Sequence, residues 1–423
     1  MRVVHTSDWH LGRTLCGRRR YDEFAAFLDW LADLVDSRAA DALLVVGDIF
    51  DGVAPTHRAQ ELYYGFLRRL SETACRDAVI VAGNHDSPSL LDAPRAVLGA
   101  LRAWVVGAPA ADPADDVRIL RDAHDRPGAL VCALPFLRER DLRVPEPGES
   151  VEDRDRRRRE GLRRRHAESA ARAIARRDEL AAFSHRPLPI LMTGHLFVAG
   201  GIVDEGDGVR DLHVGTLDAA PVDLFPPGID YVALGHLHRA QSPGGDPRLQ
   251  YCGAPLPLGF GDAGRGRVVL AVDFDDGAPP RVEPIPVPAF RRLARVRGDW
   301  PAIEARLAEL RAESAAGWLE AIYEGAELLP DLRDRVAAAL AGSGWEALRI
   351  KNERSAGLAD PAAGQTGRGD EDEDEYDGET ESALEATFEQ CLQAQGVPEE
   401  QREELRQTHR MAVAALRVEF VKS

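Results

Sequence analysis

The sequence predicts an α/β protein, and two observations carry that prediction. Short apolar, β-branched runs alternate with helical patterns from residue 1 to about residue 285. Five of those runs end directly in a short polar cluster, as strands of such a fold do where they meet a functional edge. The chain has 423 residues, which is enough for two or more domains with sizeable cores.

Helical periodicity and proline content divide the chain further. A proline-rich passage at residues 279–288 predicts a domain boundary, so we expect a first domain over residues 1–285. Residues 286–354 predict a small α+β module, with helices at 300–314 and 330–341 and strands at 318–323 and 348–350. Within the first domain, helical patterns cover residues 21–37, 57–73, 90–101 and 154–182.

The last part of the chain has a different composition. Residues 355–381 are rich in Gly, Asp and Glu and predict a flexible acidic linker. Residues 382–423 predict two amphipathic helices, at 383–394 and 398–420. A tethered helical pair buries its apolar faces poorly alone, so we expect it to dock on a partner, with docking onto the main body as the alternative.

Overall charge is a poor guide to the partner of this chain. The net charge is −18, but nine of the negative charges lie between Asp370 and Glu381. Residues 154–177 carry eleven arginines against three acidic residues. These arginines fit either a solvated helix face or contacts to nucleic-acid phosphates.

Cysteine usage and hydropathy indicate a compartment. The five cysteines are scattered and never in CxxC spacing, which is typical of the reducing cytoplasm and argues against a thiolate metal site. We see no secretory signal pattern and no apolar stretch of membrane-spanning length. We therefore expect a cytoplasmic protein with no membrane partner.

The polar clusters at the five strand ends contain metal-ligand side chains. Their candidate ligands are Asp8, His10, Asp48, Asn84, His195, His236 and His238. Asp8 and His10 are two residues apart, as are His236 and His238, so along a strand each pair would face one side. The Asp48 carboxylate has two oxygens and could bridge two cations. Ligation by Asp, Asn and His without cysteine favours Mn²⁺, with Mg²⁺, Fe²⁺ or Zn²⁺ possible.

The order of these residues resembles the calcineurin-like metallophosphoesterase superfamily, whose pattern is D-x-H, G-D, G-N-H-[DE], a single H, then G-H-x-H. The resemblance implies a four-layer sandwich of two mixed sheets flanked by helices. It also implies that Asp8, His10, Asp48 and His238 hold one metal ion, and that Asp48, Asn84, His195 and His236 hold the other.

The same resemblance assigns the two remaining residues of the Gly83–Asp86 turn. His85 would lie over the site as a non-ligand catalytic residue, stabilising the phosphoryl oxygens and donating a proton to the leaving oxygen. Asp86 is the second catalytic candidate, and it would either orient His85 or support the turn. Two divalent ions at such a site clamp a phosphate and activate a water molecule for in-line attack.

Residues outside the ligand set narrow the family. Residues 5–13, 47–51, 83–87, 210–215, 230–238 and 251–255 are similar to SbcD, the family of nuclease subunits of bacterial SbcCD complexes. The likeness implies a Mn²⁺-dependent nuclease acting on double-stranded and hairpin DNA, with double-strand 3′-5′ exonuclease and single-strand endonuclease activity. It further implies a DNA-positioning cap at 286–354 and a helical pair at 382–423 that binds the coiled-coil base of the SMC-like ATPase SbcC.

The family resemblance also implies a homodimer within a heterotetramer, formed through the helices at 57–73 and 90–101. One departure is Asp51, where many archaeal and eukaryotic relatives have a histidine; Asp is common there in bacterial members. Two other readings remain. A stand-alone phosphodiesterase or nucleotidase would act on nucleotides without a partner, and a scaffold would carry a vestigial metal site.

Overall fold

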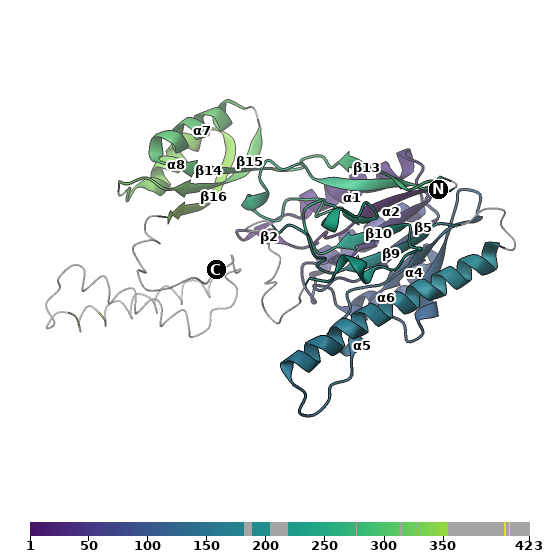
Figure 1. Ribbon diagram of the computed structural model, residues 1–423. Helices are drawn as coiled ribbons and strands as arrows, with labels where there is room; N and C mark the ends of the chain where they lie inside the picture. The colour runs from purple at the N-terminus through teal and green to yellow at the C-terminus, as the bar shows by residue number, and fades with distance from the viewer. Residues whose placement is uncertain are drawn as a thin grey trace. The chain divides into compact units, whose positions relative to one another are not determined.

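The computed structural model describes residues 1–181, 188–203, 219–275, 277–313, 315–327 and 329–353, together with residues 402 and 406 (Figure 1). The chain divides into one unit over Met1–Lys351 and a second over Asn352–Ser423. The predicted acidic linker at 355–381 lies outside the described residues. So do the predicted helices at 383–394 and 398–420, apart from residues 402 and 406, and the fragment at 210–215.

The first sheet has six strands in the order β13-β12-β1-β4-β5-β6. Strands β1, β4, β5 and β6 are mutually parallel, whereas β12 and β13 are antiparallel to their neighbours. The parallel strands are continuous apolar runs, as expected for strands buried on both faces. Their bounds are β1 (Arg2–Thr6), β4 (Ala42–Val46), β5 (Asp77–Val81), β6 (Ala103–Val106), β12 (Val268–Asp273) and β13 (Arg281–Pro286).

The second sheet has five strands in the order β11-β10-β9-β8-β7. Strands β8 to β11 are parallel, and β7 pairs antiparallel with β8. Their bounds are β7 (Val117–Arg121), β8 (Pro127–Cys132), β9 (Ile190–His195), β10 (Tyr231–Gly235) and β11 (Leu249–Tyr251). The prediction of an α/β fold with two mixed sheets is confirmed.

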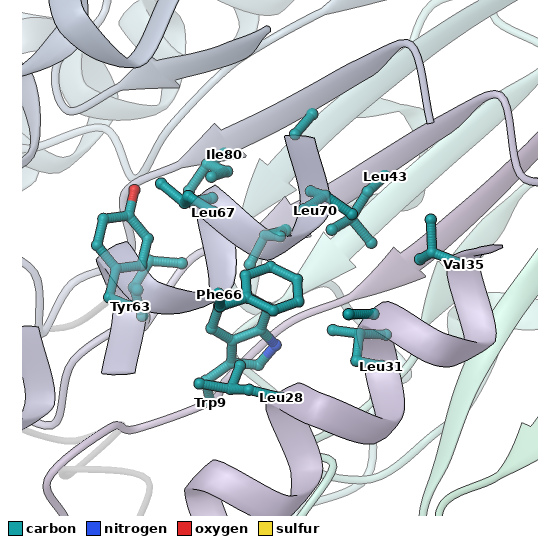
Figure 2. Packing of buried hydrophobic residues seen from close by; sticks show 14 of the residues in the cluster. Trp9, Leu28, Leu31, Val35, Leu43, Tyr63, Phe66, Leu67, Leu70 and Ile80 are labelled. Atoms are coloured by element: carbon teal, nitrogen blue, oxygen red, sulfur yellow. The ribbon is translucent and has the colours of Figure 1, made fainter. Parts of the chain in front are cut away.

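Alternate side chains along the strands build the layers. In β4, Leu44 packs between the two sheets, in a cluster with Val131 and Ala233 of the second sheet. Leu43 faces the opposite way, into a cluster with α1 and α2. Figure 2 shows this outer cluster, in which Trp9 meets the edge of Phe66 with ring centroids 5.3 Å apart. The layers are therefore helices, first sheet, second sheet and helix α6.

The helices largely begin and end as predicted. The helix expected at 90–101 is instead two short helices, because Pro94 has no N–H to continue the first of them. The bounds in this unit are α1 (Tyr21–Ser37), α2 (His57–Ser71), α3 (Pro88–Asp92), α4 (Arg95–Ala100), α5 (Glu139–Leu142), α6 (Val151–Ala181), α7 (Trp300–Ala312) and α8 (Leu332–Leu340). None of the helices within the described ranges is long and apolar enough to cross a bilayer.

Helix α6 packs on the outer face of the second sheet through unusually small residues. Its buried positions include Gly161, Ser169, Ala170 and Ala173, so the helix backbone lies close to the sheet. A Cβ at Gly161 would lie 2.0 Å from the carbonyl oxygen of Leu142. The scarcity of large apolar residues in this stretch therefore reflects close packing as well as a solvated face.

The residues after the first domain form a three-stranded sheet in the order β14-β15-β16, covered on one face by α7 and α8. Its strands are β14 (Arg292–Gly298), β15 (Ala316–Tyr323) and β16 (Gly344–Asn352). The proline-rich passage at 279–288, where we predicted a domain boundary, contains a regular strand. Pro284 and Pro286 lie in β13, an edge strand, where a missing N–H leaves no internal pair broken.

The remaining elements are short. Strands β2 (Thr14–Leu15) and β3 (Arg18–Arg19) form a hairpin between β1 and α1. The 3₁₀ turns are η1 (Pro113–Asp116), η2 (Val222–Leu224), η3 (Pro243–Gly245) and η4 (Phe260–Asp262).

Candidate metal centre

All seven candidate ligands lie at one edge of the stacked sheets. Asp8, Asp48 and Asn84 follow β1, β4 and β5 of the first sheet, while His195 ends β9 and His236 follows β10 of the second. The carboxyl ends of parallel strands share an edge, and ligands bind there in α/β proteins. Here two such edges face each other, so both sheets contribute side chains to one cluster.

The local backbone differs from the strand alternation that the sequence suggested. Asp8, His10, Asp48 and His236 lie after their strands and have positive φ angles of 53°, 48°, 49° and 96°. Such angles are costly for residues other than glycine and collect at functional sites. The pairs Asp8/His10 and His236/His238 are therefore positioned by strained turns, and the explanation from a shared strand face is wrong.

One half of the cluster contains Asp8, His10 and His238, whose ligand atoms lie within 4.8 Å of one another. Nε2 of His10 is 3.3 Å from Nε2 of His238 and 3.7 Å from Oδ2 of Asp48. All these side chains are buried. The two imidazoles thus direct their Nε2 atoms at each other beside two carboxylates.

The other half contains Asn84, His195 and His236. Oδ1 of Asn84 is 3.0 Å from Nε2 of His195 and 3.1 Å from Nδ1 of His236. Nε2 of His195 is also 3.3 Å from Oδ2 of Asp48. Asp48 therefore lies within reach of both halves, and His236 and His238 fall in different halves.

The hydrogen bonds behind the cluster test whether a cation fits it. Nδ1 of His195 donates to the Val46 carbonyl at 3.0 Å, and Nδ1 of His10 lies 3.2 Å from the Asp51 carboxylate. A neutral histidine that donates through Nδ1 has a lone pair on Nε2. Lone pairs of imidazoles and carboxylates thus converge on the same space, and divalent cations stabilise such a donor set.

Charge in the cluster is balanced through Asp48. Burial alone would raise the pKa of Asp48, but His195, His10 and His85 outweigh it and hold that pKa well below its usual range. Burial likewise opposes a charge on His195, but Asp48 and Asp8 raise the pKa of His195 to about 9. Burial lowers the pKa of His10 to about 4 and that of His236 to about 3. In the absence of metal the protonated His195 therefore neutralises the charge of the Asp48 carboxylate.

Glycines let the two sheets approach at this edge. A Cβ on Gly47 would lie 2.1 Å from Nδ1 of His195, and Gly47 has a φ of 81°. A Cβ on Gly235 would lie 1.9 Å from the Val46 carbonyl oxygen and 2.8 Å from Nδ1 of His195. The glycines before Asp48 and His236 are thus required by close contacts with the His195 ring and the Val46 carbonyl, which the sequence alone did not reveal.

His85 and Asp86 play different parts in the turn after β5. Nδ1 of His85 lies 2.9 Å from the carbonyl oxygen of Asp51, and its Nε2 is 4.0 Å from Oδ2 of Asp48. The buried Asp86 carboxylate accepts hydrogen bonds from the backbone N–H groups of Ile49, Phe50 and Gly83. These contacts favour a turn-supporting role for Asp86 over orientation of His85, so we place Asp86 as a positioning residue and not as a catalytic one.

Two further residues join the site from behind His10. Oδ1 of Asp51 lies 3.2 Å from Nδ1 of His10 and accepts a hydrogen bond from Nη1 of Arg13 at 3.1 Å. A carboxylate behind a histidine ligand fixes its tautomer and raises its basicity. Asp51 was noted in the sequence as a departure from many relatives, three residues after Asp48. The sequence did not reveal its contact with His10.

Comparisons with known proteins place the chain among phosphoesterases. The calcineurin-like phosphoesterase family matches residues 1–240, and the family described as type 5 capsule protein repressor C-terminal domain matches residues 289–396. The chain is 36% identical over 356 residues to the SbcD subunit of the nuclease SbcCD from Escherichia coli strain K12, covering 84% of this chain and 86% of the relative. It is 40% identical over 318 residues to the corresponding SbcD nuclease subunit of Rhodobacter capsulatus, covering 73% and 76%.

Solved structures add little. A dimetal phosphatase from Danio rerio is 14% identical, covers 68% of this chain and 98% of its own, and gives a TM-score of 0.35. A score this low supports no structural argument.

A side chain at position 235 should force the two sheet edges apart and separate the candidate ligands. We expect Gly235→Ala to lose bound metal and to lower the free energy of unfolding by about 3 kcal/mol, because the new methyl group would meet the Val46 carbonyl. Metal content and denaturant unfolding measure both effects. Gly65→Ala in α2 is the control, since its Cβ meets no atom within 4 Å, and it should stabilise the protein. Equal behaviour of the two variants would contradict the packing argument.

Metal binding should depend on pH through His195. Its raised pKa of about 9 means that the imidazole is protonated at pH 7, and a metal ion must displace that proton. Apparent Mn²⁺ affinity should therefore rise with pH up to about 9, by roughly tenfold per pH unit. Calorimetric titration at pH 6.5 and 7.5, in buffers of different ionisation enthalpy, measures affinity and proton release. No proton release at pH 7 would contradict this assignment.

Proposed function

Because the chain belongs to the SbcD family of nucleases within the calcineurin-like phosphoesterases, we propose that it cleaves DNA as the nuclease subunit of a complex with an SMC-like ATPase. The chain is a metal-dependent phosphodiesterase. The observation that carries the proposal is the convergence of seven side chains with nitrogen or oxygen donor atoms, Asp48 at their centre, at the facing edges of two sheets.

In this proposal the site would hold two divalent ions, which we expect to be Mn²⁺. Asp8, His10, Asp48 and His238 would hold one ion, and Asp48, Asn84, His195 and His236 would hold the other. When bound, the ions supply electrostatic stabilisation of the phosphoryl oxygens and lower the pKa of water. The hydrogen bonds to Val46 and Asp51 support this ligand set, since they direct Nε2 of His195 and His10 inward.

The residues next to the candidate ligands would position and protonate the leaving group. The Asp51 carbonyl orients His85 through Nδ1, so Nε2 faces the site near Asp48. A proton on Nε2 could pass to the leaving oxygen of the cleaved strand. Asp86 would keep His85 in register by tying the turn to the backbone of residues 49 and 50.

The finer activity is also proposed. By family membership we expect double-strand 3′-5′ exonuclease activity and single-strand or hairpin endonuclease activity. The α+β module at residues 286–354 would help to position DNA, residues 355–381 would link it to the tail, and residues 382–423 would bind the SbcC-like partner. Two chains would associate through α2 and the α3–α4 segment within a heterotetramer.

His85→Asn tests the mechanism. We expect the variant to bind the same amount of Mn²⁺ and to lose roughly 10²- to 10⁴-fold in turnover, because the proton donor is gone while the ligands remain. Release of nucleotides from linear duplex DNA with Mn²⁺, with and without the co-purified ATPase partner and with EDTA as blank, measures turnover. His124→Asn at the exposed β7–β8 turn is the matched control and should behave as wild type.

Two outcomes would contradict the proposal. Full activity in His85→Asn would remove His85 from the reaction. Hydrolysis of free nucleotides by the chain alone, with no cleavage of duplex DNA in the presence of the partner, would favour a small-molecule phosphodiesterase.

A further inference from the structure

A cavity of about 620 Å³ opens beside one half of the metal centre. Asn84, His195 and His236 line one side of it, and helix α6 lines another. Between them the lining is largely apolar and includes Leu137, Phe136, Leu196, Phe197, Leu162 and Leu224. Pockets of this size with a few polar groups hold small organic ligands or parts of larger ones. Any group bound here would lie next to the phosphate that the metal centre cleaves.

The rim that α6 contributes to this cavity carries a net positive charge. It consists of Arg156, Arg158, Arg159 and Arg163 together with Glu152 and Glu160. Arg156, Arg159 and Arg163 recur at intervals of three and four residues, which places them on one face of the helix. Arg156 pairs with Asp153, and Arg163 with Asp223, through side chains that are 40–74% exposed. Ion pairs so exposed contribute little, and a phosphate can replace the carboxylates.

The wall of the cavity also contains a buried acceptor without a donor. The side chain of His166 lines the cavity, is 2% exposed and meets the edge of Phe225 with ring centroids 5.6 Å apart. Nδ1 of His166 donates to the Leu162 carbonyl at 2.9 Å, while Nε2 has no hydrogen-bond partner among the residues described. Burial lowers the pKa of His166 to about 4, so the ring is neutral at pH 7 and Nε2 is an acceptor. A buried acceptor left unpaired is costly, and a small shift of the His166 ring toward the cavity would let a donor on a ligand pair with it.

We propose that this cavity holds one unstacked nucleobase of the strand being cut, with the base against Phe197 and a base N–H group donating to Nε2 of His166. The backbone phosphates of that nucleotide and its neighbour then lie at Arg156, Arg159 and Arg163. This inference rests on the proposed nuclease function and adds a base-binding subsite to it. A base inside a duplex cannot enter a walled cavity, so the strand end must unstack before cleavage.

The chemistry of the lining selects a base over other groups. Aromatic and aliphatic side chains stack on the flat face of any base, which suits an enzyme without sequence preference. An arginine rim around an apolar interior suits a ligand whose charge is on its backbone and whose ring is neutral. The histidine acceptor fits because all four DNA bases carry at least one N–H donor.

The test combines protein variants with a substrate that lacks one base. The substrates are a series of duplex oligonucleotides, each with one abasic residue at a different position near the cleaved bond. The full chain with its ATPase partner degrades each of them in turn. We expect wild type to lose about tenfold in kcat/KM when the abasic residue occupies the cavity position, the loss expected for one base–aromatic stack. Phe197→Leu should lower kcat/KM on the intact substrate by a similar factor. On the abasic substrate its kcat/KM should equal that of wild type, and Phe197→Tyr should retain activity on the intact substrate.

His166→Phe supplies a second, independent variant. It keeps a flat ring but removes the acceptor. It should therefore also have lower activity than wild type on the intact substrate and the same activity as wild type on the abasic one. Trp104→Leu, an exposed aromatic on β6 outside the cavity lining, is the matched control. Quenching of 2-aminopurine fluorescence in EDTA reports stacking without turnover, and it should be weaker in Phe197→Leu than in wild type.

Contrary results separate the two proposals. Equal losses of the variants on intact and abasic substrates would mean a structural effect and would overturn the subsite. Cleavage by wild type that is indifferent to the abasic residue at every position would also overturn the subsite while leaving the nuclease function intact. No cleavage of any DNA by wild type would overturn the nuclease function, and the subsite with it.

Discussion

The close approach of two sheet edges is the constraint on which the rest of the site depends. Residues with the ligand side chains come from both sheets, and no single sheet supplies them all. Gly47 and Gly235 permit that approach, since a methyl group at either position would occupy the space of the His195 ring or the Val46 carbonyl. The apolar layer between the sheets holds the edges in register, so packing far from the ligands determines their spacing.

Hydrogen bonds behind the candidate ligands orient their lone pairs toward one space, as a cation site requires. Val46 and Asp51 each fix one histidine so that its other nitrogen faces the centre. Asp86 ties the turn after β5 to the loop after β4, and thereby keeps His85 and Asp48 in a constant relation. The strained backbone at Asp8 and Asp48 persists because these bonds and the buried packing determine it from several sides.

The order of motifs in the sequence was sufficient to predict the fold class and to name the seven candidate ligands that the structure brings together, because their motifs follow apolar strands and glycine precedes several of them. Local periodicity was insufficient where tertiary contacts decide: Asp8 and His10 sit in a strained turn and not on a strand face, and Pro284 lies inside an edge strand. The role of Asp51 and the unpaired Nε2 of His166 were beyond prediction, since both depend on contacts between segments far apart in the chain.

The dinuclear centre is the central claim, and electron paramagnetic resonance of the full chain loaded with Mn²⁺ tests it most directly. The geometry predicts two ions per chain with a spin-coupled spectrum, because the Asp48 carboxylate lies within reach of both ligand groups. In Asp48→Asn the coupling should disappear. One ion per chain, or two uncoupled ions in the wild-type protein, would contradict the shared carboxylate and the arrangement built around it.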